Sequence, residues 1–429
     1  MTHTIPGFAL SSLSELTWPS IGRVLSDPER HWPREILERP MVRQDIAGRP
    51  VVMLADPDAF RTILVDRAPF FPRAPEQGRL LRRFLGASIM TAPPDGPGPQ
   101  RRSFAKVFGA ATGANRVPAM VAAAKSLIRQ WGESASVDVV AEATGLSLDV
   151  MWRCLIDDAN QEHPDPVVQD MAAKLAAHPF GLSDLAGLMI LLTARLAALS
   201  ADEVDQDLSG LREAGGTLAA HEAVLDNARL FLQAGHHTIS AAIAWSLLML
   251  AGDPISQERA RVEIDQVLGD QPLRIDQLAQ LTALREIVDE TLRLFPPSAL
   301  PRLAGEDLVV GGERVPAGSC VILNFFALHR HRRWWRDPDR FEPQRFASDA
   351  GELRHPQAYL PFGSGPHRCI AANFAMVELM TVLAVILREV HLETLSDAAP
   401  TAIHRLITMP GTGRSIRIRH REGVKSDAR

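Results

Sequence analysis

The chain has 429 residues, of which 46% are hydrophobic and 23% charged, and its formal net charge is −5. This balance excludes sequence-independent binding to nucleic acid, which requires a basic surface, and we expect a small-molecule ligand instead. Its three cysteines, Cys154, Cys320 and Cys369, are far apart in the sequence. They exclude a disulfide-rich scaffold and suit a reducing compartment.

The N-terminus, MTHTIPGFALSSLSEL, has neither the basic and apolar regions of a signal peptide nor a run of about 20 apolar residues. We therefore predict a cytoplasmic protein without a membrane anchor. The apolar stretch 230–251 is nearly long enough to cross a bilayer, but Gln233, His236, His237 and Thr238 lie inside it. Polar groups at mid-bilayer are costly, so we predict a helix buried at the centre of a large soluble protein.

In chain order, residues 50–54 predict a strand and residues 57–65 a helix. From 119 to 281 the apolar residues recur at intervals of three and four, which predicts an overwhelmingly helical region. Pro254 ends the long buried helix, because proline cannot continue it.

Further along, β-branched runs separated by Gly-Gly and Pro-Ala-Gly predict a small hairpin at 307–323. A glycine-rich loop around Cys369 precedes a final helix at 373–390, and the tail after His420 is expected to fray. The pattern indicates a mainly α fold with a minor β region, in a single domain over 1–429.

The stretch 362–375, FGSGPHRCIAANFA, places a lone cysteine between a glycine-rich loop and a helix. Unpaired N–H groups at a helix N-terminus favour the thiolate, which is the form of cysteine that binds metal. Gly363 and Gly365 would let the backbone come close to the group that the sulfur binds. The alternative is a buried structural cysteine beside a tight turn.

This stretch resembles the haem-binding signature of the cytochrome P450 family: Phe, two residues, Gly, three residues, Cys. Phe362, Gly365 and Cys369 match it, and His367 stands where members often have a His or Arg that contacts a haem propionate. Ala371 replaces the glycine that is usual two residues after the cysteine. The resemblance implies the cytochrome P450 fold, haem b (iron protoporphyrin IX) as cofactor, and Cys369 as the axial ligand to the iron.

Arg302, after a double proline, matches the position of a propionate-binding arginine. Its planar guanidinium can form two parallel hydrogen bonds to a carboxylate. Arg101 lies in a segment that resembles the helix which usually supplies another propionate ligand, although Pro97 stands where the family has Trp or His. The resemblance thus gives seven cofactor-binding residues: Cys369, His367, Arg302, Arg101, Phe362, Gly363 and Ala234.

Glu290 and Arg293 form a Glu-x-x-Arg pair, which on its own is a common and weak helix ion pair. In the family this pair joins the arginine of a Phe-x-Pro-x-Arg-Phe segment, which here is Arg345. The resemblance implies that the three charges form a structural ion-pair triad that holds the segment before the cysteine loop.

The segment Ala234-Gly235-His236-His237-Thr238 is similar to the family's Ala-Gly-x-acid-Thr stretch. Ala234 and Gly235 would leave room for a large flat group, and Thr238 can bond back to a carbonyl one turn earlier. The resemblance makes Gly235, His237 and Thr238 catalytic residues, with Thr238 helping to deliver protons to oxygen. We hypothesise that His237 takes over the relay from the usual acid, since imidazole titrates near pH 6.5. The alternatives are peroxide-driven chemistry or a histidine that only contacts its helix neighbours.

The resemblance implies a monooxygenase that uses O2 and electrons to hydroxylate a lipophilic small molecule. The electrons would come from a separate ferredoxin or flavodoxin with an NAD(P)H-dependent reductase. A basic patch could steer that partner, or could be a solvated cluster packed on tryptophans; it comprises Arg330, Arg332, Arg333, Arg336 and Arg368. The rival readings are a haem-thiolate peroxygenase or isomerase, and a non-catalytic ligand sensor in which His236 or His237 closes the iron site.

The substrate pocket is expected to be apolar, which favours a lipophilic ligand. Its predicted lining is the loop 70–89, the region 176–199, Leu230, Phe231, Ser298, Ala299 and Thr408. Arg79, Arg82 and Arg83 could meet a substrate carboxylate or be solvated.

Overall fold

A computed structural model describes residues 32–46, 49–73, 81–82, 85–92, 101–102, 104–131, 136–155, 221–296, 300–348, 355–396, 400–404, 407–411 and 413–421. The predicted pocket region 176–199, Ser298, Ala299, Pro97, Arg79, Arg83 and the tail beyond 421 lie outside the described residues.

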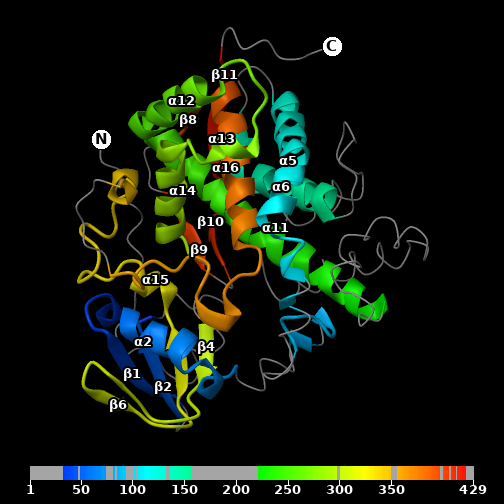
Figure 1. The fold of residues 1–429 in the computed structure, drawn as a ribbon. Helices are drawn as coiled ribbons and strands as arrows, with labels where there is room; N and C mark the ends of the chain where they lie inside the picture. The colour runs from blue at the N-terminus through cyan, green and yellow to red at the C-terminus, as the bar shows by residue number, and fades with distance from the viewer. Residues whose placement is uncertain are drawn as a thin grey trace.

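Helix α11, His221–Gly252, runs through the middle of the molecule (Figure 1). Most of its side chains from Val224 onward are buried, which confirms the predicted central helix. Pro254 ends α11 and is also the first residue of α12, Pro254–Leu268, whose N-cap Asp253 accepts a hydrogen bond from the Ser256 N–H. Among the described helices no single one is long and apolar enough to cross a membrane; α11 and α12 reach that threshold only as a pair bent by 108°.

The other long helices pack around α11 and share one hydrophobic core with it. They are α5 (Ala110–Gln130), α6 (Val139–Leu155), α14 (Thr282–Leu294) and α16 (Ala372–Glu389), with the short α13 (Ile275–Leu278) beside them. α16 confirms the helix predicted at 373–390. The predicted helical region 119–281 is interrupted by strand β3, Ser136–Asp138, because its backbone pairs with a strand near the C-terminus.

A four-stranded sheet forms the lower part of the molecule in Figure 1 and has its own small core. Its order is β1 (Met41–Ile46), β2 (Arg49–Leu54), β7 (Cys320–Leu323) and β4 (Leu300–Leu303), with β2 and β7 parallel and the other pairs antiparallel. β2 confirms the predicted strand. The helix predicted at 57–65 is present as α2 (Pro57–Arg61) followed by a wider turn, η5 (Thr62–Asp66).

The predicted hairpin at 307–323 is correct only in its first half. β5 (Leu308–Val310) and β6 (Glu313–Val315) pair across Gly311 and Gly312, whose positive φ angles of 57° and 84° suit a tight two-residue turn. β7 instead leaves the hairpin and joins the four-stranded sheet, because β2 and β4 offer it a partner on both edges.

The remaining described elements are short: β8 (Val390–Thr394) and β11 (Ser415–His420), which form a sheet with β3; β9 (Ala402–His404) and β10 (Thr408–Pro410), which form a pair; α15 (Phe325–Leu328); and the turns η4 (Arg34–Leu37), η6 (Ala68–Phe70), η8 (Pro343–Phe346) and η9 (Gly365–His367). The fold class predicted from the sequence, mainly α with a minor β region, is confirmed.

Candidate cofactor site around Cys369

The loop that carries Cys369 is held by its own backbone. The Cys369 N–H donates to the Phe362 carbonyl at 2.8 Å, and Gly363 and Gly365 have φ angles of 67° and 68°. A Cβ on Gly365 would lie 1.7 Å from the Leu64 carbonyl oxygen, whereas a Cβ on Gly363 would meet no protein atom within 4 Å. Gly365 is therefore packed closely against the backbone of η5. Its approach to a group bound by the sulfur stays a prediction.

The Cys369 side chain is exposed, although the surrounding protein partly desolvates its thiol. Desolvation raises the pKa of the thiol, while the Ala371 N–H and the charges of Arg101 and Arg368 lower it. A metal at this sulfur would complete the deprotonation, since a coordinated thiol is held as thiolate.

Four basic side chains, which we term the cation cluster, lie within electrostatic reach of one another: Arg73, Arg101, Arg302 and His367. Burial and then the neighbouring arginines lower the pKa of His367 to about 4, and burial followed by the charge of Arg73 lowers that of Arg302 to about 10. Within the described part of the chain, no carboxylate lies within ion-pair distance of any of the four. The cluster is therefore built for an anion that the described side chains do not supply.

Each arginine of the cluster is tied to a backbone carbonyl. Arg302, buried in β4, donates from Nη1 to the Pro301 carbonyl at 2.9 Å. Arg101 donates from Nη2 to the carbonyl of Arg368, directly before Cys369, and Arg73 donates from Nη1 to the carbonyl of Met90. Sequence reasoning missed Arg73; its one signal was a basic residue directly after the apolar run Pro-Phe-Phe-Pro.

On α11, Thr238 is exposed although it lies within the core helix, and Ala234, one turn earlier, is half-buried. The Thr238 hydroxyl donates to the Ala234 carbonyl at 2.9 Å, which is the expected back-bond. Phe108 links this helix to the cysteine segment, because its ring lies 4.9 Å from Phe231 of α11 and 5.8 Å from Phe374 in the first turn of α16. α11 and the segment after Cys369 thus border the same region.

A sequence model of the family described as Cytochrome P450 matches residues 203–416. Cytochrome P450 4V2 from Homo sapiens is 37% identical over 210 residues, covering 48% of this chain and 40% of the relative. Cytochrome P450 4c3 from Drosophila melanogaster is 35% identical over 212 residues, covering 48% and 40%. The chain belongs to the cytochrome P450 family.

The solved heme domain of cytochrome P450DA superposes with a TM-score of 0.74 at 24% identity, over 89% of this chain and 90% of that one. This likeness shows the cytochrome P450 fold. The chain spans about two fifths of the length of the two relatives it matches.

Haem is the cofactor of the cytochromes P450, and the residues present fit it. A porphyrin with two propionates supplies the anionic charge that the cation cluster lacks, and arginine pairs carboxylates well. Cys369 offers a single accessible thiol, and the described residues contain no group of three or more His, Cys, Asp or Glu that could hold a bare metal ion. The residues that would hold haem are therefore Cys369 and the cation cluster, with Phe362 and Ala234 half-buried against the adjoining core.

The sequence predicted that Gly235 would leave room for a large flat group, but the structure fills that space. A Cβ at Gly235 would lie 2.6 Å from the Met151 terminal methyl carbon, so the open side of Gly235 is filled by α6. Ala234 lies about 100° around the helix axis from Gly235. The expectation that Gly235 leaves space for a flat group is therefore wrong, and its part in catalysis stays a prediction.

His236 and His237 are both buried, with ring centroids 4.0 Å apart. The His236 Nδ1 donates to the Leu232 carbonyl at 2.8 Å, and burial lowers its pKa to about 4. Burial and the adjacent His236 lower the pKa of His237 well below its usual value. One premise of the relay hypothesis, titration near neutral pH, is therefore wrong for this ring, and the relay itself stays a prediction.

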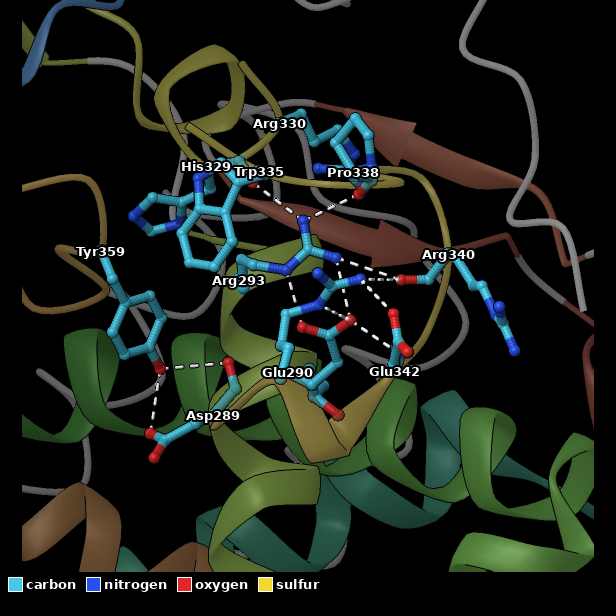
Figure 2. A network of polar contacts seen from close by, with 12 residues as sticks. Asp289, Glu290, Arg293, His329, Arg330, Trp335, Pro338, Arg340, Glu342 and Tyr359 are labelled. Atoms are coloured by element: carbon cyan, nitrogen blue, oxygen red, sulfur yellow. Dashed lines mark hydrogen bonds and ion pairs between the residues drawn. The ribbon is translucent and has the colours of Figure 1, made fainter. Parts of the chain in front are cut away.

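The three charges of the Glu-x-x-Arg and Phe-x-Pro-x-Arg-Phe segments meet in one buried site, which we term the triad: Glu290, Arg293 and Arg345. Figure 2 shows Glu290 and Arg293 at the centre of this network. Glu290 Oε2 accepts from the Arg293 Nε at 2.6 Å, and its Oε1 accepts from the Arg345 Nε at 3.0 Å. Arg293 also donates to the carbonyls of His329 and Pro338 at 2.8 and 2.7 Å. The triad thus fastens the segment that leads to the cysteine loop, as the resemblance implied.

Arg330 does not belong to the predicted basic patch, because it is buried with its guanidinium 4.0 Å from the centre of the Phe326 ring. Arg332 pairs with Glu38, and Arg333 lies over the Trp334 ring. Arg336 and Arg368 are exposed.

Of the predicted pocket residues that the structure describes, Leu230, Phe231 and Thr408 are buried. The Thr408 carbonyl accepts from the Trp245 indole at 2.9 Å. Arg82 is exposed, so the interpretation of that arginine as a solvated side chain fits better than contact with a substrate.

Proposed function

We propose that this cytochrome P450 is a haem-thiolate monooxygenase that hydroxylates a lipophilic small molecule with O2 and electrons from a separate partner. The observation that carries the proposal is the accessible Cys369 thiol beside a cation cluster without a carboxylate partner in the described part of the chain. That combination provides a thiolate ligand and a complement to propionates within one site.

Cys369 and its surroundings supply the electronic part of the proposed reaction. When bound, haem with a thiolate ligand activates dioxygen, because the sulfur donates electron density and favours O–O cleavage. The Ala371 N–H and the charge of Arg101 stabilise the sulfur as thiolate and moderate its basicity. Arg101 also fixes the loop through its bond to the Arg368 carbonyl.

Thr238 is the proposed proton-handling group on the distal side. Its hydroxyl hydrogen is directed to the Ala234 carbonyl, so the oxygen lone pairs are available on the exposed side to accept a hydrogen bond from water. A water held there is placed to deliver protons, which is the general acid role expected of this position. His237 can take part only as a neutral ring that accepts a proton on one nitrogen and releases one from the other, because burial disfavours the imidazolium.

The proposed electron donor is a ferredoxin or flavodoxin with an NAD(P)H-dependent reductase. Support comes from Arg368, an exposed cation directly before Cys369 in the cysteine loop, where electrostatic steering of an acidic partner would act. Arg333 and Arg336 are exposed as well. A cytoplasmic location and a single-domain organisation remain predictions.

The ligand-sensor alternative loses support from the histidines. It needs His236 or His237 to reach an iron on the accessible side of α11, but both rings are buried and His236 is committed to the Leu232 carbonyl. The peroxygenase alternative is separated from the proposal by its source of oxygen.

Turnover tests the proposal. The purified protein is screened with straight-chain alkanoic acids and alkanes of increasing length for a substrate-induced change in haem spin state, and the best ligand is then incubated with ferredoxin, reductase and NADPH under 18O2. We expect an alcohol that carries 18O, and no product from Cys369→Ser, while Cys320→Ser, at the half-buried cysteine of β7, keeps the activity. Product formed only with hydrogen peroxide would contradict the proposal and support a peroxygenase.

A further inference from the structure

The loop 85–92 lies between α11 and the cation cluster and is bound on both sides. From α11, the Asp226 Oδ2 accepts from the Ala87 N–H at 2.8 Å, and the Asn227 Oδ1 accepts from the Ile89 N–H at 3.0 Å. On the other side, Arg73 of the cluster donates to the Met90 carbonyl. The backbone of one short loop thus forms hydrogen bonds both with α11 and with the cation cluster.

The loop is shaped for this contact. Gly86 has a φ of 53°, and a Cβ there would lie 2.1 Å from an Asp226 carboxylate oxygen, so only glycine allows the approach. Thr91 closes the turn from inside, because its hydroxyl donates to the Gly86 carbonyl at 2.5 Å and accepts from the Ser88 N–H at 3.0 Å. The Asp226 carboxylate is itself oriented by Arg229, whose Nη1 donates to its Oδ1 at 2.8 Å.

The position of the anchor on α11 connects the loop to the site. Asn227, Phe231, Ala234 and Thr238 follow one another at intervals of four, three and four residues, so they share one face of the helix. Thr238 lies eleven residues beyond Asn227, which corresponds to roughly 16 Å along the axis at the helical rise. The loop therefore rests on the face of α11 that carries the exposed threonine.

We propose that Asp226 and Asn227 are positioning residues that fix the loop 85–92 against α11 and, through the Met90 carbonyl, hold Arg73 in the cation cluster. This inference rests on the proposed haem site, in which Arg73 meets a propionate. The loop 85–92, which borders the substrate side, and Arg73, which meets the propionate, are then held by one connected group of contacts. Loosening the loop at α11 should therefore weaken haem binding.

Two measurements on one set of variants test the proposal. Hydrogen exchange of the Ala87 and Ile89 amides is followed by mass spectrometry in wild type, Asp226→Ala, Asn227→Ala and their double variant, both with and without added haem. We expect exchange to become about tenfold or more faster in the double variant, since both amides lose their acceptors. Asp226→Asn with Asn227→Asp, which keeps an acceptor at each position, should restore slow exchange. Thr144→Val, which removes a buried hydroxyl bond in α6, is the matched control and should leave both amides unchanged.

The second measurement is the rate at which haem passes to an excess of apomyoglobin. We expect the double variant to lose haem about tenfold faster than wild type, and Arg73→Met to do the same. Because the effect runs through Arg73, adding the double variant to Arg73→Met should produce little further acceleration.

Slow exchange in the double alanine variant would overturn the positioning role. Fast exchange with unchanged haem loss, or fully additive acceleration with Arg73→Met, would overturn the link through Arg73. If the wild-type protein takes up no haem, the proposed function fails, while exchange in the haem-free samples still decides the contact between α11 and the loop. The single variants report on each anchor separately where the double variant does not fold.

Discussion

The triad and the cation cluster contain the same kinds of side chain in opposite arrangements. In the triad, one buried carboxylate is shared by two buried arginines, and the spare donors of those arginines are bound by backbone carbonyls. In the cation cluster, burial and then neighbouring arginines lower the pKa of Arg73, Arg302 and His367, and no described carboxylate neutralises these groups.

The difference separates a structural site from a binding site. Charges that are balanced within the chain hold segments together, whereas unbalanced charges reduce stability and are retained where a ligand supplies the missing sign. Substitutions in the triad should therefore lower stability, whereas substitutions in the cation cluster should leave stability nearly unchanged and weaken haem binding. The predictions below run from the largest expected effect to the smallest.

The largest effect is expected in the triad. Glu290→Gln leaves two buried guanidinium groups without their counter-charge and should lower the free energy of unfolding by about 3–5 kcal/mol. Urea unfolding measures this. Glu342→Gln is the control, because Glu342 also pairs with Arg345 but is 36% exposed, and it should cost less than about 1 kcal/mol. Equal effects of the two variants would contradict the structural role of the triad.

A buried carboxyl outside both regions tests how a buried acid affects the pH dependence of stability. Burial raises the pKa of Glu378 in α16 to about 8, while the nearby Ser147 hydroxyl lowers it. The folded state then binds a proton that the unfolded chain has released above about pH 4.5, so the stability due to this group falls as pH rises from about 4.5 to about 8. Glu378→Gln should remove up to about 5 kcal/mol of that fall. Unfolding curves measured across this pH range check it, and an unchanged pH slope would contradict it.

Removing a charge from the cation cluster should cost little stability. Arg302→Gln relieves repulsion by Arg73 and should leave the stability of the haem-free protein within about 1 kcal/mol of wild type. Haem affinity should fall about tenfold, since one propionate partner is lost. Haem titration and urea unfolding measure the two quantities, with Arg314→Gln on the exposed β5–β6 hairpin as the control. A large loss of stability together with unchanged haem affinity would reverse the assignment of this cluster.

The smallest effect is expected at His367. Its pKa of about 4 lies below the ordinary 6.5, so the unfolded chain binds more protons between these values and stability falls as pH is lowered through that window. His367→Gln should reduce this acid sensitivity in the haem-free protein. Bound haem should reduce it too, because propionate charge offsets the neighbouring arginines. Thermal unfolding with and without haem checks both, and a steeper acid dependence after haem binding would contradict the placement of a propionate here.

Much of the fold could be predicted because its signals are local. The apolar stretch 230–251 and the helix at 373–390 follow from periodicity, and Gly311-Gly312 marks the turn between β5 and β6. The parallel pairing of β2 with β7 could not be predicted, since it joins residues more than 260 positions apart and local pattern contains no such information.

The candidate site shows the same contrast between residues found from local motifs and residues placed by tertiary contacts. Cys369, Arg302 and the triad were found through motifs with fixed spacing, whereas Arg73 was missed because it reaches the cluster only through tertiary contacts. Gly235 and Arg330 were misjudged for a related reason: what fills the space beside a glycine, or covers an arginine, depends on the neighbouring Met151 and Phe326. Spacing identifies candidate residues, but packing decides which way they face.

The central claim is that the Cys369 thiolate binds the iron of haem, and the spectrum of the reduced, carbon-monoxide-bound protein tests it most directly. We predict a Soret band shifted to the red of that of histidine-ligated haem proteins, and its loss in Cys369→Ser but not in Cys320→Ser. A wild-type protein that binds haem and shows no such shift, or a shift that survives Cys369→Ser, would contradict the account.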